Sequence, residues 1–148
     1  MSEENKALVR RVFEEAWSQG RIEVIDEVTS PDFVDHDPQN PSRGTRGPDA
    51  IKPLVTMYRK AFPDLSLTID AMYADGDQVI TRWTATGTHT GELPGMPATG
   101  KRSTITGISI DCVEDGEITE SWTNWDTLGM LQQLGIAPGA EAAATAAG

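Results

Sequence analysis

The chain has 148 residues, 38% of them hydrophobic, which is the size of one domain with one core. Its 23 acidic and 12 basic residues give a formal net charge of −11 at pH 7. Nucleic acids and anionic membranes are bound through clustered Lys and Arg, so this charge disfavours both as partners. The single cysteine, Cys112, excludes an intramolecular disulfide and a zinc site made of several thiolates.

The start of the chain is polar, and no apolar run approaches the roughly 20 residues that span a bilayer. We therefore expect a cytoplasmic protein with neither a signal peptide nor a membrane-spanning helix. Only two histidines are present, and the spacing of His36 between two aspartates is weak evidence for metal binding. No metal site is predicted.

Helical periodicity dominates the first part of the chain. Apolar residues recur at intervals of three and four, which is typical of amphipathic helices. Pro53 fits such a helix only near its start, where its missing N–H needs no acceptor. A short strand around Phe33 and a Pro/Gly-containing loop over 35–47 separate the second helix from the third. The predicted helices cover residues 5–19, 22–28 and 48–62.

After residue 64 the pattern alternates every two residues, which indicates β-strands. Asp126 then suits the N-cap of a last helix, which Gly135 ends. Helices segregated from antiparallel strands predict the α+β class, with one domain over 1–136 and a flexible Ala/Gly-rich tail over 137–148. The predicted strands cover residues 65–73, 78–88, 102–113 and 117–125.

Six short stretches follow one another along nearly the whole chain: 32–38 (DFVDHDP), 62–65 (FPDL), 86–91 (TGTHTG), 95–100 (GMPATG), 115–118 (DGEI) and 132–135 (QQLG). Together they resemble the SnoaL-like polyketide cyclase family, within the superfamily of nuclear transport factor two and ketosteroid isomerase. The resemblance implies a cone-shaped barrel, in which a strongly curved antiparallel sheet and N-terminal helices surround an apolar pocket. It also implies a cofactor-independent enzyme that performs acid/base chemistry on a small, apolar, carbonyl-bearing ligand.

The family's catalytic aspartate and its assisting histidine correspond to Thr123 and Ser109, counted back from 115–116 without a gap. This departure leaves a second function open, a non-catalytic small-molecule-binding or dimerisation module of the same fold. A third possibility is an epoxide hydrolase of the limonene epoxide hydrolase type, which uses an arginine and two aspartates. The chain offers only Arg82 of that set, and Thr84 stands where a carboxylate is wanted.

Three residues are candidates for catalysis, each with a structural alternative. His36, beside the long loop, could act as an acid or base, as histidines often do, and is otherwise a surface histidine. Arg82 could bind a carboxylate or an enolate, or pair with Asp70 across a hairpin. Asp126 is the carboxylate nearest the expected catalytic position, and is otherwise only a helix cap. The enzyme hypothesis gains support if these side chains project into a pocket. It loses support if they point to solvent or form helix caps and ion pairs. His89 is expected to order the loop that follows it.

The pocket wall follows from the turn between the last two strands. A three-residue turn at 114–116 would place a polar set on the pocket face: Gly107, Ser109, Asp111, Thr119, Ser121, Thr123 and Trp125. The opposite face would then carry Ile108, Ile110, Cys112, Ile118 and Trp122, and would favour a homodimer if no helix covers it. Cys112 itself is interpreted as a small buried hydrophobe. The predicted ligand-binding residues are Phe33, Tyr58, Thr84, Ser109, Thr123 and Trp125.

Overall fold

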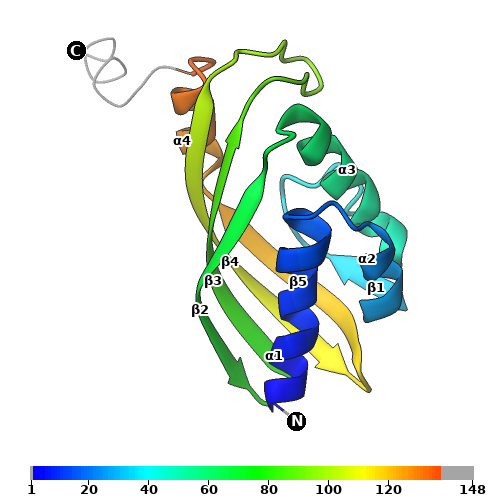
Figure 1. Ribbon diagram of the computed structural model, residues 1–148. Coiled ribbons are helices and arrows are strands. Elements are labelled where there is room, and N and C mark those ends of the chain that lie inside the picture. Colours follow the sequence, from blue (N-terminus) through cyan, green and yellow to red (C-terminus); the bar gives the residue numbers. More distant parts are fainter. Residues whose placement is uncertain (1, 138–148) are drawn as a thin grey trace, which may run out of the picture.

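The computed structural model describes residues 2–137, in which a five-stranded sheet carries helices α1, α2 and α3 on one face (Figure 1). The expected tail over 137–148 lies outside the described residues, apart from Ala137. None of the helices in the described range is both long and apolar enough to cross a membrane.

The first predicted helix is present and changes type along its length. Helix α1 spans Ser2–Arg11, and a π-helical segment, η1, continues it over Val12–Trp17. The wider π turn accommodates one extra residue, a feature that is frequent at functional sites. Helix α2 follows over Glu23–Val28.

The third predicted helix is divided near its start. A 3₁₀ turn, η2, spans Pro48–Ala50, and helix α3 spans Lys52–Ala61. Pro53 therefore lies in the first turn of α3, where the N–H that it lacks would have no partner within the helix.

The sheet has the strand order β1-β5-β4-β3-β2, and a short helix, α4, over Thr127–Gln133 follows the last strand. Strands β2 to β5 form an antiparallel meander, whereas β1 runs parallel to β5. The sheet is thus mixed, and the expected all-antiparallel sheet is wrong in this respect. The strands span Thr29–Asp35 (β1), Ser66–Asp75 (β2), Gln78–Thr88 (β3), Arg102–Glu114 (β4) and Glu117–Trp125 (β5).

The turn between β4 and β5 has two residues, Asp115 and Gly116, because Glu114 pairs with Glu117. The predicted three-residue turn is wrong. A bulge at Thr119, the third residue after the turn, restores the expected division between the two faces of the sheet, which the shorter turn alone would have reversed on β5. Two predictions change as a result: Ile118 faces the core, with 2% of its surface exposed, and Thr119 does not line the pocket. Beyond the bulge the expected grouping holds, with Asp111 opposite Ser121 and Ser109 opposite Thr123.

A second irregularity lies in β2, where the pairing with β3 shifts between Ile69 and Ala71. The shift reverses the faces of the residues that follow. Met72 packs against the core and Tyr73 is 64% exposed, although simple alternation groups Tyr73 with the buried Leu67.

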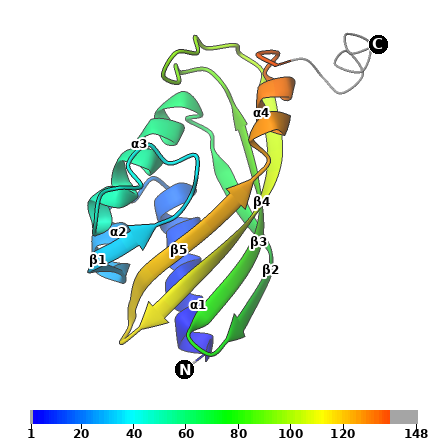
Figure 2. The ribbon, with the colours of Figure 1, turned by 180° about the vertical axis from the view of Figure 1, so that it is seen from behind.

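The two faces of the sheet differ in what covers them. Helices α1 and α2 pack on the inner face and α3 lies over it, and seen from behind the strands lie in front of α1 (Figure 2). On the outer face Ile108 is 51% and Trp122 37% exposed. Cys112 also lies on this face and is only partly buried, so its interpretation as a buried hydrophobe is wrong.

Helix α4 packs against β4 beyond the end of β5. The Gln133 side chain accepts a hydrogen bond from the Thr104 N–H (2.7 Å) and donates one to the Thr104 carbonyl (2.9 Å). The glutamine amide thus pairs with a strand edge that β5 leaves free.

Candidate functional site

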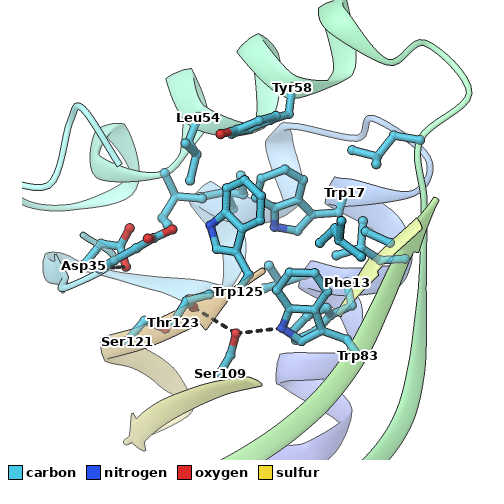
Figure 3. Close-up of a pocket in the computed structure, with 18 of the residues that line it drawn as sticks. Phe13, Trp17, Asp35, Leu54, Tyr58, Trp83, Ser109, Ser121, Thr123 and Trp125 are labelled. Carbon is cyan, nitrogen blue, oxygen red and sulfur yellow. Dashed lines mark hydrogen bonds between the residues drawn. The ribbon is translucent and has the colours of Figure 1, made fainter. Parts of the chain in front are cut away.

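A cavity of about 140 Å³ lies between the inner face of the sheet and the helices η1 and α3 (Figure 3). Its wall is largely apolar and includes seven aromatic side chains. Tyr58 meets Trp125 edge-on, with ring centroids 5.9 Å apart, and packs against Trp17 at 6.3 Å. Phe13 lies 6.4 Å from Trp83 on the same wall. Such a surface favours a flat, apolar ligand.

Two aspartates face the cavity from adjoining positions in the sheet. Asp35, the last residue of β1, pairs with Ser121 on β5, and Ser121 pairs with Asp111 on β4. Neighbouring strands lie about 4.8 Å apart, so the Cα atoms of the two aspartates are roughly 10 Å apart, with Ser121 between them. The Ser121 hydroxyl donates a hydrogen bond to the Asp111 carboxyl group. Asp37 lines the same end of the cavity from the start of the long loop.

Asp111 is 8% exposed, and burial raises its pKa to about 7. The bond from Ser121 opposes this rise, and the nearby charge of Asp35 adds to it. About half of the molecules therefore hold Asp111 as a neutral acid at pH 7. In that form its carboxyl proton is a hydrogen-bond donor inside an apolar cavity.

Asp35 and Asp37 are equally buried, at 3% and 5% exposure, and burial raises the pKa of both. Both receive donors that favour the charged form. The Asn40 amide donates to Asp35 at 2.5 Å, and the Gln39 N–H donates to Asp37 at 2.9 Å. Burial thus raises the pKa of all three carboxyls, and the rise is large at Asp111, a difference of the kind that separates an acid from a base.

Tyr58 remains protonated beside this cluster. Burial raises its pKa to about 12, and the charge of Asp37 acts in the same direction. The phenol is therefore a hydrogen-bond donor across the physiological range.

A chain of neutral hydrogen bonds lies next to the carboxyl cluster (Figure 3). The Trp83 indole N–H donates to the Ser109 hydroxyl at 3.0 Å, and this hydroxyl lies 2.8 Å from that of Thr123. The two hydroxyls carry two protons, and their mutual bond uses one. One O–H donor thus remains at the cavity wall for a ligand oxygen.

Five of the six predicted ligand-binding residues line the cavity: Phe33, Tyr58, Ser109, Thr123 and Trp125. The sixth, Thr84, does not. It lies on the outer face, where its hydroxyl donates to Asp70 at 2.6 Å. The alternation of β3 explains this position, because its neighbour Trp83 occupies the inner face.

The three predicted catalytic residues lie outside the cavity. His36 stacks on Trp122 at 4.8 Å, and its Nε2 lies 2.6 Å from the Glu120 carboxylate. Asp126 accepts a hydrogen bond from the Gly129 N–H at 2.9 Å, which confirms its interpretation as a helix cap.

Arg82 projects from the outer face beside Asp70 and is exposed. The ion pair predicted between these two residues is not found among residues 2–137, since Asp70 accepts from Thr84 instead. By the criterion of location, all three positions count against the catalytic roles expected of His36, Arg82 and Asp126.

The loop-ordering prediction for His89 is confirmed. Its Nδ1 lies 3.0 Å from the Thr99 hydroxyl and accepts from the Thr99 N–H at 3.3 Å, which ties both ends of the loop together.

The sequence reasoning did not single out the buried carboxyls, although two signals pointed to them. Asp35 and Asp37 flank His36, so an outward His36 requires both aspartates to face inward on an extended chain. Asp111 stood in the polar set expected at the pocket. Within residues 2–137 no cluster of three or more His, Cys, Asp or Glu side chains is arranged to hold a metal ion.

Known proteins are similar to this chain in sequence and in fold. The chain is 32% identical over 134 residues to the aklanonic acid methyl ester cyclase DauD of Streptomyces sp. (strain C5), covering 86% of this chain and 80% of that protein. It is 30% identical over 122 residues to the nogalonic acid methyl ester cyclase of Streptomyces nogalater, covering 81% and 90% of the two chains. Among solved structures, TsrD from Streptomyces laurentii superposes with a TM-score of 0.82 at 27% identity, covering 93% of this chain and 98% of TsrD.

The fold of residues 2–137 is accordingly the nuclear-transport-factor-two-like α+β fold that the sequence resemblance implies. The model of the SnoaL-like polyketide cyclases matches residues 7–134. That range includes the whole cavity wall, the three buried aspartates and the hydroxyl pair. This chain therefore belongs to the SnoaL-like polyketide cyclase family.

Proposed function

We propose that the protein is a cofactor-independent enzyme that closes a ring within an apolar, polyketide-like ligand by acid/base chemistry. The observation that carries this proposal is the arrangement of Asp35, Ser121 and Asp111 across three strands at one end of an aromatic cavity. Asp35, whose hydrogen-bond donors favour its charged form against the effect of burial, thus lies across Ser121 from Asp111, which is a neutral acid in about half of the molecules at pH 7. The methyl ester cyclases that the chain resembles supply the class of ligand. We also infer that sheet and helices form the curved cone typical of the family.

In the proposed reaction, Asp35 removes a proton from the carbon next to a ligand carbonyl. The enolate carbon then bonds to a second carbonyl carbon of the same molecule. Asp111 donates its proton to the oxygen that becomes an alcohol, and the free hydroxyl proton of the Ser109–Thr123 pair bonds to the enolate oxygen. A proton transfer from Asp35 to Asp111 restores the starting state.

Activity of carboxamide variants tests the assignment. With aklanonic acid methyl ester as substrate, Asp35→Asn and Asp111→Asn should each lower kcat by about 10²- to 10⁴-fold, the usual contribution of a general acid or base. His36→Ala and Asp126→Asn are the controls, and both should keep wild-type turnover. Unchanged turnover in both carboxyl variants, or loss in the controls alone, would contradict the assignment. Loss in Asp37→Asn without loss in Asp35→Asn would move the base to Asp37.

A second candidate function is a binding module that holds the same ligand without turnover. The specific observation in its favour is the uncharged Ser109–Thr123 pair at the positions where the family has its catalytic histidine and aspartate. Because Trp17, Trp83 and Trp125 line the cavity, ligand binding should quench tryptophan fluorescence. Quenching by aklanonic acid methyl ester without any product would favour this module over the enzyme.

We further propose that a second copy of the chain packs on the outer face of the sheet. Ile108 and Trp122 expose large apolar surfaces there, at 51% and 37%. Light scattering on the wild type should give twice the mass of one chain, and Ile108→Lys should lower it to that of one chain. A monomeric wild type would contradict this assembly.

A further inference from the structure

The far end of the cavity, away from the carboxyl cluster, carries a buried hydroxyl without a partner. Ser103 lies at the start of β4, lines the cavity and is 4% exposed. Within residues 2–137 its Oγ has no hydrogen-bond partner. Burying an unpaired hydroxyl costs free energy. Because this hydroxyl lies at a cavity wall, its position indicates that a bound molecule supplies the missing hydrogen-bond partner.

His89 brings a second unpaired donor to the same end of the sheet. It is fully buried and stacks on Phe62 at 5.2 Å, and the Phe62 ring lines the cavity. Because Nδ1 accepts the Thr99 N–H, the imidazole proton belongs on Nε2. That Nε2 is buried and, within the described part of the chain, unpaired.

The sheet register brings these two residues near each other. Ser103 pairs with Gly87 across β3 and β4, and His89 follows Gly87 by two residues, on the same face. The backbone N–H of His89 donates to the Lys101 carbonyl at 2.9 Å, so the pairing of the two segments continues past the end of β3. Gly87 itself lies under Phe62, where an added Cβ would approach the Phe62 side chain to 3.0 Å.

Ser103 and Ser109 are separated by six residues on β4, which corresponds to about 20 Å of extended strand. A ligand that bonds to the hydroxyl pair with one end would therefore reach Ser103 only if it is long and flat, with an acceptor at its other end. The wall between these points is apolar or aromatic, from Ile105, Ala85 and Leu65 to Trp83.

We propose that Ser103 forms, with His89 beside it, a distal subsite that binds an acceptor oxygen, such as an ester or ketone carbonyl, at the far end of an elongated polycyclic ligand. The Ser103 O–H, at the cavity wall, is the donor to the ligand, whereas His89 does not line the cavity and contacts its wall through the Phe62 ring. The subsite rests on the proposed function only in that the cavity takes an apolar, carbonyl-bearing molecule. The subsite adds the requirement that the ligand carry a second polar group, far enough from its reacting end to reach Ser103.

Binding of two probes, followed by tryptophan quenching, tests the subsite. Methyl anthraquinone-2-carboxylate and 2-ethylanthraquinone share the tricyclic core, and only the first carries an ester acceptor at one end. The wild type should bind the ester about five-fold more tightly, the effect of one hydrogen bond. Ser103→Ala should remove this preference and leave the affinity for 2-ethylanthraquinone unchanged.

Thr81→Val is the matched control. Thr81 is the other buried hydroxyl without a partner in the described residues, and it does not line the cavity. This variant should keep the five-fold preference. Ser103→Ala should also leave the melting temperature equal or higher, because it removes an unpaired polar group, whereas a structural hydroxyl would lower it.

The outcomes separate the subsite from the function. Equal affinity of the wild type for both probes, or an unchanged preference in Ser103→Ala, overturns the subsite while the ligand class stands. Failure of the wild type to bind either probe overturns the proposed ligand class together with the subsite.

Discussion

The stability of the protein should depend on pH through Asp111, and the Asp111→Asn variant isolates this dependence. The unfolded chain ionises Asp111 near its ordinary pKa of 3.8, whereas the folded chain retains the proton up to a pKa of about 7. Between these values the folded state binds more protons, so the free energy of unfolding falls as the pH rises.

The size of the effect follows from the shift. Each pKa unit corresponds to 1.36 kcal/mol, so the full shift of about 3 units lowers the free energy of unfolding by about 4 kcal/mol above pH 7. Asparagine has the shape of the neutral acid and can still accept the Ser121 hydrogen bond, but it does not ionise. Between pH 5 and pH 8 the stability of Asp111→Asn relative to the wild type should therefore rise by about 3 kcal/mol.

Urea unfolding followed by tryptophan fluorescence at pH 5, 6, 7 and 8 measures this difference. Asp115→Asn is the control, because Asp115 is exposed in the β4–β5 turn, and asparagine tolerates its positive φ of 52°. This control should follow the pH dependence of the wild type. If Asp111→Asn differs from the wild type by the same amount at every pH, Asp111 does not titrate near 7 and the reasoning fails.

Three further substitutions test how the site is held. Asn40→Ala removes buried donors from Asp35 and from the Ala50 carbonyl, and should lower the free energy of unfolding in urea by about 3 kcal/mol, more than the exposed Asn124→Ala. Gly107→Ala would place a Cβ against the Trp83 ring, so we expect about 1–3 kcal/mol of destabilisation and a red-shifted tryptophan emission; unchanged values would contradict this packing. Gln133→Ala should cost about 1 kcal/mol in urea unfolding, and Gln132→Ala, its neighbour, is the comparison.

Local sequence patterns predicted most of the secondary structure, because the determinants of an element lie within it. The bounds of β3 and β5 agree with the structure to the residue, and Pro53 lies in the first turn of α3, near a helix start as expected, although the division before α3 was not predicted. The N-cap of α4 was also readable, since Asp126 and its partner Gly129 are only three residues apart. The resemblance to the family supplied the fold that joins these elements.

The candidate site was harder to predict because it depends on features that strand alternation does not encode. The bulge at Thr119 decides which residues of β5 face the cavity, and a turn pattern alone gives the opposite result for Ile118. The parallel pairing of β1 with β5 places Asp35 beside Ser121, and no local signal specifies that neighbour. The pKa of Asp111 arises from burial in the assembled domain, which only a three-dimensional structure supplies.

The parallel pairing of β1 and β5 also bears on how the protein folds. Asp35 and Ser121 are 86 positions apart in the chain (121 − 35), whereas β2 to β5 are successive antiparallel neighbours joined by turns and one longer loop. Closing the longer segment costs more chain entropy, so the meander is expected to form before β1 docks. Docking of β1 then buries Asp35 beside Asp111, so the step that completes the site is also the step that brings two carboxyl groups together. In hydrogen exchange, the amides of β1 should open more readily than those of β3 and β4, and more so as the pH rises.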